Sequence, residues 1–211
     1  MKNKPFRHGI KRTFDVIVAA AVLLASMPLL ICVALLIRWK MGSPVFFRQR
    51  RPGLRSEPFE MIKFRTMRPP RDDEEASLTD SQRLTGLGRF LRKTSIDELP
   101  ELWNVLRGEM SLVGPRPLLM EYQDRYTPEQ ARRHEVKPGI TGWAQVNGRN
   151  AIRWDEKFLL DVWYVDHVNL WVDLCILAKT AWKVLCREGI SAIEHPTMPE
   201  FAPNSKMRDA A

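Results

Sequence analysis

The pattern of hydrophobic and polar positions is dominated by one long apolar run near the start of the chain. Every residue from Val16 to Ile37 is uncharged, and a stretch of this length predicts a membrane segment before it predicts a buried helix. Pro28 lies near the middle of the run. Its ring removes a backbone donor and crowds the carbonyl of Leu24, so the helix should kink or break. Ser26 is close enough to help satisfy a freed carbonyl, as the hydrocarbon requires.

Basic residues flank this run on both sides, Lys11 and Arg12 before it and Arg38 and Lys40 after it. The positive-inside rule is satisfied at both ends only if both lie in the cytoplasm. At about 1.5 Å per residue, each arm beside the proline reaches roughly 15–18 Å, near half of the ~30 Å hydrocarbon core. The sequence therefore predicts a re-entrant helix–break–helix, broken at Ser26 and Pro28, with a kinked single span as the alternative.

Downstream of the run, alternating segments predict a pair of short strands. Val45–Phe47 and the segment 59–67 have strand character, and a Pro-Gly pair at 52–53 predicts a turn between them. Because strand side chains repeat every two residues, Lys63 and Arg65 should lie on one face. This arrangement would direct two cations to the same side of the hairpin.

Capping signals predict the helices that follow. Ser95 and Glu98 fit a capping box, whereas Pro100 favours a start near Leu99; in either case the helix should stop at Gly108. The remaining expectations are a solvated loop over 69–80, a short helix opening at Thr127-Pro128, an irregular glycine-rich loop over 138–148, and helices over Trp154–His167 and Leu170–Glu188, the second ended by Gly189.

The last two predicted helices are rich in aromatic residues, namely Trp154, Trp163, Tyr164, Trp171 and Trp182. Such residues are typical of helices that lie on a membrane surface, and ordinary core tryptophans are the alternative. The expected fold class is α/β, mainly helical. The chain is expected to divide into a basic lead-in with the membrane helix (1–40), a membrane-associated body (41–190) and a loose tail (191–211).

Composition narrows the expected partners. The net charge of +8 and the pI of about 9.7 indicate anionic head groups or phosphorylated substrates. Nucleic acid is not expected, because the basic residues are spread out and form no dense tail. Cys32, Cys175 and Cys186 lie in apolar settings without metal-ligand spacing, which indicates reduced packing residues. The histidines show no paired spacing either, so a histidine metal site is not expected.

Candidate chemistry centres on the adjacent carboxylates Asp97 and Glu98. Taken alone, acids near a helix start are explained by capping and the helix dipole. Several cations in the sequence change that balance: Arg92, Lys63, Arg65, and Arg116, which lies between two prolines. Carboxylates among fixed cations suit a diphosphate bound through a divalent metal. A helix start and Mg²⁺ would keep Asp97 ionised and able to act as a nucleophile. No Walker-type loop is present in the sequence, which argues against nucleoside triphosphate hydrolysis.

Six separated motifs give the chain a wider resemblance. They are KRTFD (11–15), PVFFRQRRPG (44–53), FEMIKFRTM (59–67), LRKTSIDELPELWNVLRGEMSLVGPRP (91–117), KPGITGWAQVNG (137–148) and WVDLCIL (171–177). In these motifs the chain resembles the bacterial sugar transferase family, the monotopic phosphoglycosyl transferases. The resemblance extends from about Lys11 to Gly189, and the short length suggests the minimal catalytic form.

The resemblance implies an activity and a location. Members transfer a sugar-1-phosphate from a UDP-sugar to undecaprenyl phosphate, which releases UMP and begins the assembly of a surface glycan. They lie on the cytoplasmic face of the bacterial inner membrane, against anionic lipid, through a re-entrant helix. The family mechanism would make Asp97 the nucleophile, with Glu98 beside it and Mg²⁺ at Asp97. It would make Arg92 and Arg116 phosphate ligands and Asp173 a further carboxylate. The sugar, the pathway and any oligomer are left open.

Three positions depart from the usual family pattern. Met27 precedes Pro28 where a serine is common, Ser56 replaces a frequent glycine, and Cys175 replaces a frequent lysine. A second reading, from another class, is a membrane-tethered protein that binds anionic lipid or nucleic acid through its basic face. It accounts for the charge and the apolar run but not for the carboxylate pair, the Pro-Arg-Pro segment and the glycine-rich motif together.

Overall fold

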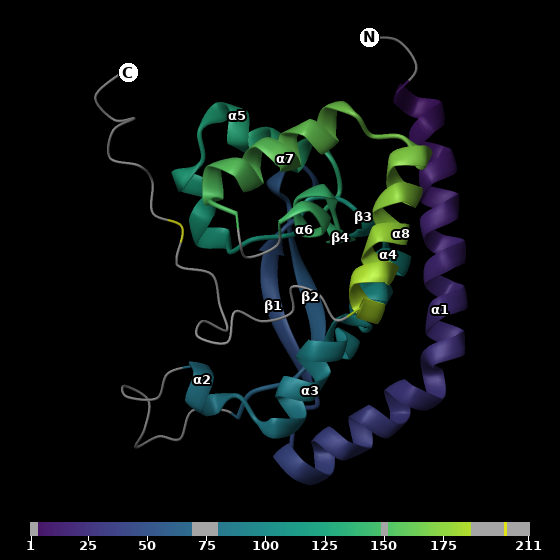
Figure 1. Ribbon diagram of the computed structural model, residues 1–211, viewed down its shortest axis with the longest axis vertical. Helices are drawn as coiled ribbons and strands as arrows, with labels where there is room; N and C mark the ends of the chain where they lie inside the picture. Colours follow the sequence, from purple (N-terminus) through teal and green to yellow (C-terminus); the bar gives the residue numbers. More distant parts are fainter. Residues whose placement is uncertain (1–3, 69–79, 149–151, 187–200, 202–211) are drawn as a thin grey trace.

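The computed structural model describes residues 4–68, 80–148, 152–186 and 201, and Figure 1 shows how its elements are arranged. The longer helices are α1 (Lys4–Met41), α3 (Gly86–Thr94), α4 (Glu101–Arg107), α7 (Trp154–Asp166) and α8 (Leu170–Cys186). The strands are β1 (Phe46–Pro52), β2 (Pro58–Phe64), β3 (Ser111–Val113) and β4 (Gly139–Thr141). Shorter turns of helix are α2 (Asp80–Arg83), α5 (Pro128–Ala131), α6 (Trp143–Asn147), η1 (Leu54–Ser56), η2 (Ile96–Glu98), η3 (Met120–Arg125) and η4 (Arg132–Glu135). The mainly helical α/β class is confirmed.

The apolar run forms one helix, α1, that changes direction part-way along its length (Figure 1). Pro28 lies inside it, which accounts for a bend because the proline supplies no N–H to the carbonyl of Leu24. The Ser26 hydroxyl donates to the carbonyl oxygens of Val22, at 2.7 Å, and Leu23. Ser26 therefore bonds the turn before the proline, as serine in bent helices often does, and does not reach the Leu24 carbonyl that had been expected as its partner.

α1 has the length and composition of a membrane helix. Its stretch Gly9–Met41 has a mean hydropathy of 2.8 in its most apolar window, and only 11% of that window is buried inside the protein. A helix in the core of a soluble protein would be mostly buried. Among the described residues, α1 is therefore the one helix that is long and apolar enough to cross a membrane, and most of its apolar window is not buried by the protein.

Both arms of α1 nevertheless pack against the body of the protein. On the arm before the bend, Ala19 is fully buried in the main core, beside Val105 and Ile176. On the arm after it, Val33 and Ile37 are buried in a second cluster with Leu91 and Phe64. The residues near the bend are exposed, with Leu24 at 71%.

β1 and β2 form an antiparallel hairpin, in register from Phe46 opposite Phe64 to Pro52 opposite Pro58. The predicted turn at Pro52-Gly53 and both predicted strands are confirmed, although β2 ends at Phe64, before Arg65. Phe59 and Met61 on one face are buried in the main core, so this face of the hairpin points toward α4 and the candidate site.

The glycine-rich motif is more regular than predicted. Residues 138–148 contain β4, which pairs in parallel with β3, and then α6. The glycines permit close backbone contact: a Cβ on Gly139 would lie 2.0 Å from the Gly114 nitrogen, and one on Gly142 would lie 2.2 Å from the Gly114 oxygen. The prediction of an irregular loop is wrong because the glycines serve this close approach rather than disorder in the backbone.

α7 agrees with its predicted bounds to within one residue, and α8 begins at Leu170 as predicted, while the predicted end of α8 at Gly189 lies outside the described residues. α5 begins with the predicted Thr127 cap and Pro128. Trp171 and Trp182 are 73% and 63% exposed, which excludes a core role for these two residues. Trp154 instead packs in a third cluster with Tyr122, Phe158 and Phe201. Because Phe201 is buried there, the prediction of a loose tail is wrong at this residue, and the rest of the predicted tail over 191–211 lies outside the described residues. The predicted loop over 69–80 also lies outside them, except for Asp80, which begins α2.

Candidate active site

Asp97 and Glu98 lie in η2, between α3 and α4. Ser95 ends α3 in a left-handed conformation, φ 55°, and its backbone N–H donates to carbonyls of that helix. The Ser95 side chain makes no cap bond to η2, and α4 begins only at Glu101. The predicted capping box is therefore wrong, while the alternative start near Leu99 is close to the structure.

Glu98 is engaged by two cations instead of a backbone N–H. Its Oε1 accepts from Lys63 Nζ at 2.8 Å and from Arg116 Nη2 at 2.5 Å. Burial alone would raise the pKa of Glu98, but Arg116 and Lys63 outweigh it and hold that pKa well below its usual range. Glu98 is thus a fixed anion that orients Lys63 from β2 and Arg116 from the Pro-Arg-Pro segment.

Asp97 differs from Glu98 in its hydrogen bonds and in the direction of its pKa shift. It is 8% exposed, and within the described residues no donor is bonded to its side chain. Burial raises the pKa of Asp97 and Glu98 adds to the rise, while Lys63, Arg92 and Arg116 act in the opposite direction. Burial and the adjacent anion therefore outweigh the nearby cations in the direction of the Asp97 pKa shift, and ionisation of Asp97 by a helix start together with Mg²⁺ stays a prediction. Asp97 is left available for a bound cation or substrate.

Arg92 and Arg65 have different partners in the structure, and of the two only Arg92 acts on Asp97. Arg92 Nε donates to Thr66 Oγ1 at 3.0 Å, and its charge acts on Asp97. Arg65, predicted to bind phosphate with Lys63, is buried and donates to the carbonyls of Met41, Gly42 and Ser43. Its donors satisfy the C-terminal end of α1 and the turn that follows, so Arg65 holds α1 to the hairpin, and a role in phosphate binding stays a prediction.

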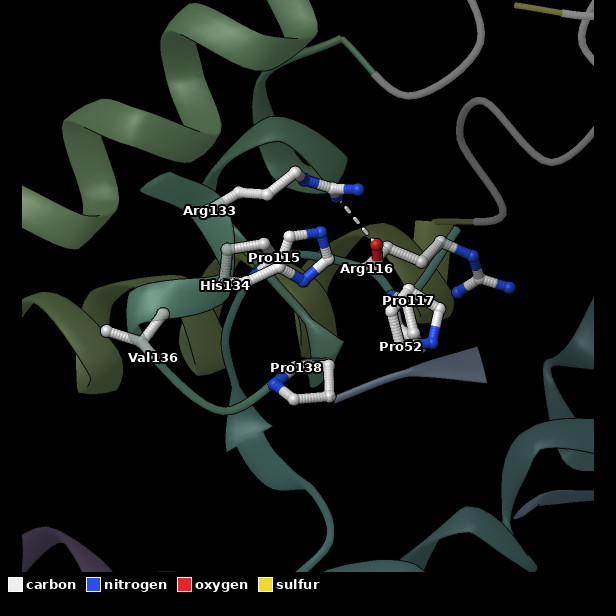
Figure 2. A pocket seen from close by; sticks show the side chains of 8 residues that line it. All are labelled: Pro52, Pro115, Arg116, Pro117, Arg133, His134, Val136 and Pro138. Atoms are coloured by element: carbon white, nitrogen blue, oxygen red, sulfur yellow. Dashed lines mark hydrogen bonds between the residues drawn. The ribbon is translucent and has the colours of Figure 1, made fainter. Parts of the chain in front are cut away.

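Arg116 is held by more than its flanking prolines. Arg133 Nη2 donates to the Arg116 carbonyl at 2.7 Å, as the dashed line in Figure 2 shows, and to Asp161 Oδ2 at 2.8 Å. Both Arg133 and Asp161 are 2% exposed. This buried ion pair fixes the backbone of Arg116, while the Arg116 side chain, 33% exposed, extends to Glu98.

A shallow pocket lies on one side of Arg116 (Figure 2). Half of its lining residues are proline; the set is Pro52, Pro115, Arg116, Pro117, Arg133, His134, Val136 and Pro138. Asp97 and Glu98 do not line it, so Arg116 is the link between the pocket and the carboxylate pair. Burial lowers the pKa of His134 to about 4, with Arg133 acting in the same direction, so this imidazole is neutral at physiological pH.

Asp173, the further carboxylate of the prediction, belongs to a structural network. Its Oδ2 accepts from Lys11 Nζ at 2.6 Å, and its Oδ1 accepts from the Tyr164 hydroxyl at 2.7 Å. Tyr164 also donates to the Val113 carbonyl, and Asp15 accepts from Ser111. The structure thus uses the first motif and Asp173 to join α1, β3 and α8, with none of these bonds reaching Asp97 or Glu98.

Some residues of the site were not anticipated from the sequence. Glu101, 1% exposed, lies 2.8 Å from Lys63 Nζ, and burial raises the pKa of Glu101. Arg133 and Asp161 form the support of Arg116 described above. A signal existed for Glu101, since it follows the carboxylate pair on a short helix, but the pairing of Arg133 with Asp161 depends on packing between distant segments.

The donors present decide whether a divalent cation suits the site. Within the described ranges, no group of three or more His, Cys, Asp and Glu side chains is arranged to hold a metal. Mg²⁺ commonly uses one or two carboxylates together with substrate phosphates and water. Asp97 has a carboxylate without a hydrogen-bond donor among the described residues, so the site fits a magnesium ion that is shared with a bound diphosphate, and not an all-protein cage.

Comparison with known proteins assigns this chain to a family. The family model described as "Bacterial sugar transferase" matches residues 6–187. This chain belongs to the bacterial sugar transferase family. The first and last residues of that match lie in α1 and just after α8, so the family match covers the long apolar helix α1, the hairpin and the carboxylate pair alike.

Individual relatives agree with this assignment. The chain is 56% identical to the "Uncharacterized sugar transferase EpsL" of Bacillus subtilis, over 91% of this chain and 95% of that protein. It is 38% identical to the "UDP-glucose:undecaprenyl-phosphate glucose-1-phosphate transferase" of Escherichia coli, over 82% of this chain and 40% of that protein. It is also 38% identical to the "Undecaprenyl-phosphate galactose phosphotransferase" of Salmonella typhimurium, over 85% of this chain and 41% of that protein. The chain spans about two fifths of the length of these last two relatives.

Proposed function

We propose that this protein transfers a sugar-1-phosphate from a UDP-sugar to undecaprenyl phosphate and releases UMP. The observation that carries the proposal is a buried Asp97 with no hydrogen-bond donor among the described residues, beside Glu98, which orients Lys63 and Arg116. The names of the relatives in Escherichia coli and Salmonella typhimurium describe this class of reaction. The product would be the first membrane-bound intermediate of a surface glycan.

The arrangement suits a covalent route in two steps. In the first, an Asp97 oxygen attacks the β-phosphorus of the UDP-sugar, the bond from that phosphorus to the bridging oxygen breaks, and UMP leaves. In the second, an oxygen of the lipid phosphate attacks the same phosphorus and the aspartyl bond breaks. The lipid diphosphate sugar departs and Asp97 is restored as a carboxylate.

The surrounding residues have distinct tasks in this scheme. Arg116 and Arg92 bring positive charge to phosphate oxygens, and Arg116 has the planar guanidinium that binds phosphate through two donors. Lys63 neutralises Glu98 and Glu101 on the other side. Asp97, together with the two phosphates of the nucleotide sugar, would hold Mg²⁺, which supplies charge neutralisation for the carboxylate and the diphosphate when bound.

The function is tested by UMP release from a panel of UDP-sugars in the presence of Mg²⁺ and a polyprenyl phosphate. The proposal expects UMP with at least one UDP-sugar, and only a slow or single-turnover signal when the lipid is omitted. A membrane-tethered binding protein would release no UMP with any member of the panel, which would reject the proposed reaction.

The membrane arrangement that we propose is a re-entrant α1 with both ends on the cytoplasmic face of the inner membrane. It is supported by the bend and by the packing of both arms on the same body: Ala19 lies in one cluster, and Val33 and Ile37 lie in the other. A straight span would carry part of that body into the hydrocarbon, where its polar groups could not be satisfied. The exposed Trp171 and Trp182 of α8 suit a helix at the membrane surface.

Cysteine labelling tests this topology. We expect single cysteines placed at Lys4 and at Lys40, in a background without Cys32, Cys175 and Cys186, to be labelled from the same, cytoplasmic side. Pro28→Leu should straighten the helix, favour spanning and lower activity, because it restores the missing backbone donor. Labelling of the two positions from opposite sides in the unaltered sequence would overturn the re-entrant arrangement.

Arg116 gives a second test of the site. Arg116→Ala should slow turnover roughly ten- to a hundredfold, because a charge-assisted contact of about 1.5–3 kcal/mol is lost. Arg116→Lys should recover only part of that loss, since lysine does not offer two parallel donors. Steady-state kinetics with varied UDP-sugar checks this expectation; an alanine variant with wild-type kcat and KM would remove Arg116 from the substrate site.

A further inference from the structure

Arg51 is a cation on the inner face of the hairpin. It lies opposite Phe59 in the β1–β2 register, as Gln49 lies opposite Met61 and Phe47 opposite Lys63. Residues directly opposite one another in an antiparallel pair share a face. Because Phe59 and Met61 are buried in the core and Lys63 reaches Glu98, Arg51 projects on the side that faces the candidate site.

The exposure pattern along β1 agrees with this placement. Gln49 and Arg51 are half-buried, whereas Arg48 and Arg50 are exposed. Arg48 on the outer face pairs with Glu60, with a distance of 3.0 Å between Nη1 and Oε1. The strand therefore presents arginines to both sides, and only Arg51 of these three is directed inward.

Among the described residues, Arg51 lacks the carboxylate partner that its burial would ordinarily require. Its Nη2 donates to Gln49 Oε1 at 2.6 Å, and its Nε is buried without a hydrogen-bond partner. Within the part of the chain that the structure describes, no carboxylate lies at ion-pair distance from it. A half-buried guanidinium with an unused donor is costly unless an anion completes it.

Arg116 connects Arg51 to the carboxylate pair. Its guanidinium bonds Glu98, next to Asp97, and Lys63, which shares the inner face of the hairpin with Arg51, bonds the same Glu98 oxygen. Burial, and then the charge of Arg116, lower the pKa of Arg51 to about 10. The two guanidinium groups therefore repel each other in the free protein, and a group with two negative charges that bridges them would relieve this repulsion.

We propose that Arg51 is a substrate-binding residue that contacts the α-phosphate, the phosphate that leaves with the nucleoside. In an in-line displacement the leaving oxygen lies opposite the attacking one. With Asp97 at the β-phosphorus, the α-phosphate extends away from Asp97, past Arg116 and toward the end of β1. This assignment rests on the proposed function, which supplies the diphosphate, and adds a residue that binds the UMP portion of the nucleotide sugar before UMP leaves in the first step.

The experiment measures equilibrium binding of UMP with Mg²⁺ and, separately, UMP release from a UDP-sugar. Arg51→Ala should weaken UMP binding and raise the KM for the UDP-sugar roughly ten- to a hundredfold, with the KM for the lipid phosphate unchanged. Arg51→Lys should lie between the alanine variant and the wild type, because it keeps the charge without the planar donors. Arg48→Ala, from the outer face of the same strand, is the matched control and should bind UMP as the wild type does.

Each outcome decides one of the two claims. Wild-type UMP binding in Arg51→Ala, or a defect confined to the lipid KM, overturns the assignment of Arg51. A wild type that does not bind UMP overturns it as well. A wild type that binds UMP but never releases it from a UDP-sugar rejects the proposed function instead, while the binding data still judge Arg51. If Arg51→Ala fails to fold, as shown by its circular dichroism, the binding data for Arg51→Lys decide the assignment.

Discussion

Asp97→Asn should abolish turnover while leaving the fold intact. The substitution keeps the size and shape of the side chain but removes the negative charge, and an amide does not attack phosphorus. We expect the rate of UMP release to fall by roughly 10⁴-fold or more, the scale of loss when a covalent nucleophile is removed. Stability should not fall, because no hydrogen bond to the Asp97 side chain is made within the described residues and because burial and Glu98 already disfavour its ionised form.

The measurement combines UMP release with thermal unfolding in the same detergent or nanodisc. Asp166→Asn, an exposed carboxylate on α7, serves as the control and should keep wild-type turnover. An Asp97→Asn protein that retains even a hundredth of the wild-type rate at an unchanged unfolding temperature would show that this carboxylate is not the nucleophile.

Asp161→Ala should cause the largest loss of stability. It removes the partner of Arg133, and both side chains are almost fully inside the protein, 2.8 Å apart. Breaking a buried pair from one side costs about 3–5 kcal/mol, because the remaining charge is left without compensation. Lys157, whose pKa burial lowers to about 8, would lose the same anion. We expect a much lower denaturation midpoint and, at temperatures where the variant is folded, weaker binding by the loosened Arg116.

The same two helical segments provide the control. Arg132 and Asp166 form an ion pair at the protein surface. Arg132 is the residue before Arg133 in η4, and Asp166 lies on α7 with Asp161. Asp166→Ala should change the midpoint little, since exposed pairs contribute little to stability. The double replacement Asp161→Leu with Arg133→Met should recover much of the stability lost in Asp161→Ala, but not the hold on the Arg116 carbonyl. Equal destabilisation by Asp161→Ala and Asp166→Ala would contradict the assigned role of the buried pair.

Features set by local sequence were predictable. The uncharged run from Val16 to Ile37 and its proline predicted a bent apolar helix, because the hydrophobic pattern and the length of such a helix are decided within one segment. The hairpin turn at Pro52-Gly53 and the cap at Thr127 were equally local. The carboxylate pair Asp97-Glu98 and its cations Lys63 and Arg116 could be selected by residue type, since binding a diphosphate requires that chemistry.

Features set by tertiary contacts could not be predicted from the sequence. Ser95 and Glu98 have the spacing of a capping box, but α3 ends in a left-handed Ser95, and two cations from elsewhere in the chain bind Glu98. Arg65 alternates correctly with Lys63, yet β2 ends before it and the guanidinium turns to the carbonyls at the end of α1. In both cases a distant partner outweighed the local preference.

The glycines and the pKa of Asp97 show the same limit of sequence reasoning. Gly139 and Gly142 look like signals for an irregular loop, and only the position of Gly114 against them reveals a tight strand contact. The direction of the Asp97 pKa shift depends on how deeply Asp97 is buried, which no spacing along the sequence encodes. The buried support of Arg116 by Arg133 likewise required the packing of η4 against α7.

The most direct test of the covalent route is the intact mass of the protein after exposure to a UDP-sugar and Mg²⁺ without a lipid acceptor. The account predicts that the wild type gains the mass of one sugar phosphate and that an equal amount of UMP is released. It also predicts that Asp97→Asn gains nothing and that adding polyprenyl phosphate restores the unmodified mass. No adduct on the wild type under conditions of slow hydrolysis, together with UMP that appears only when both substrates are present, would contradict it and leave Asp97 as a metal ligand alone.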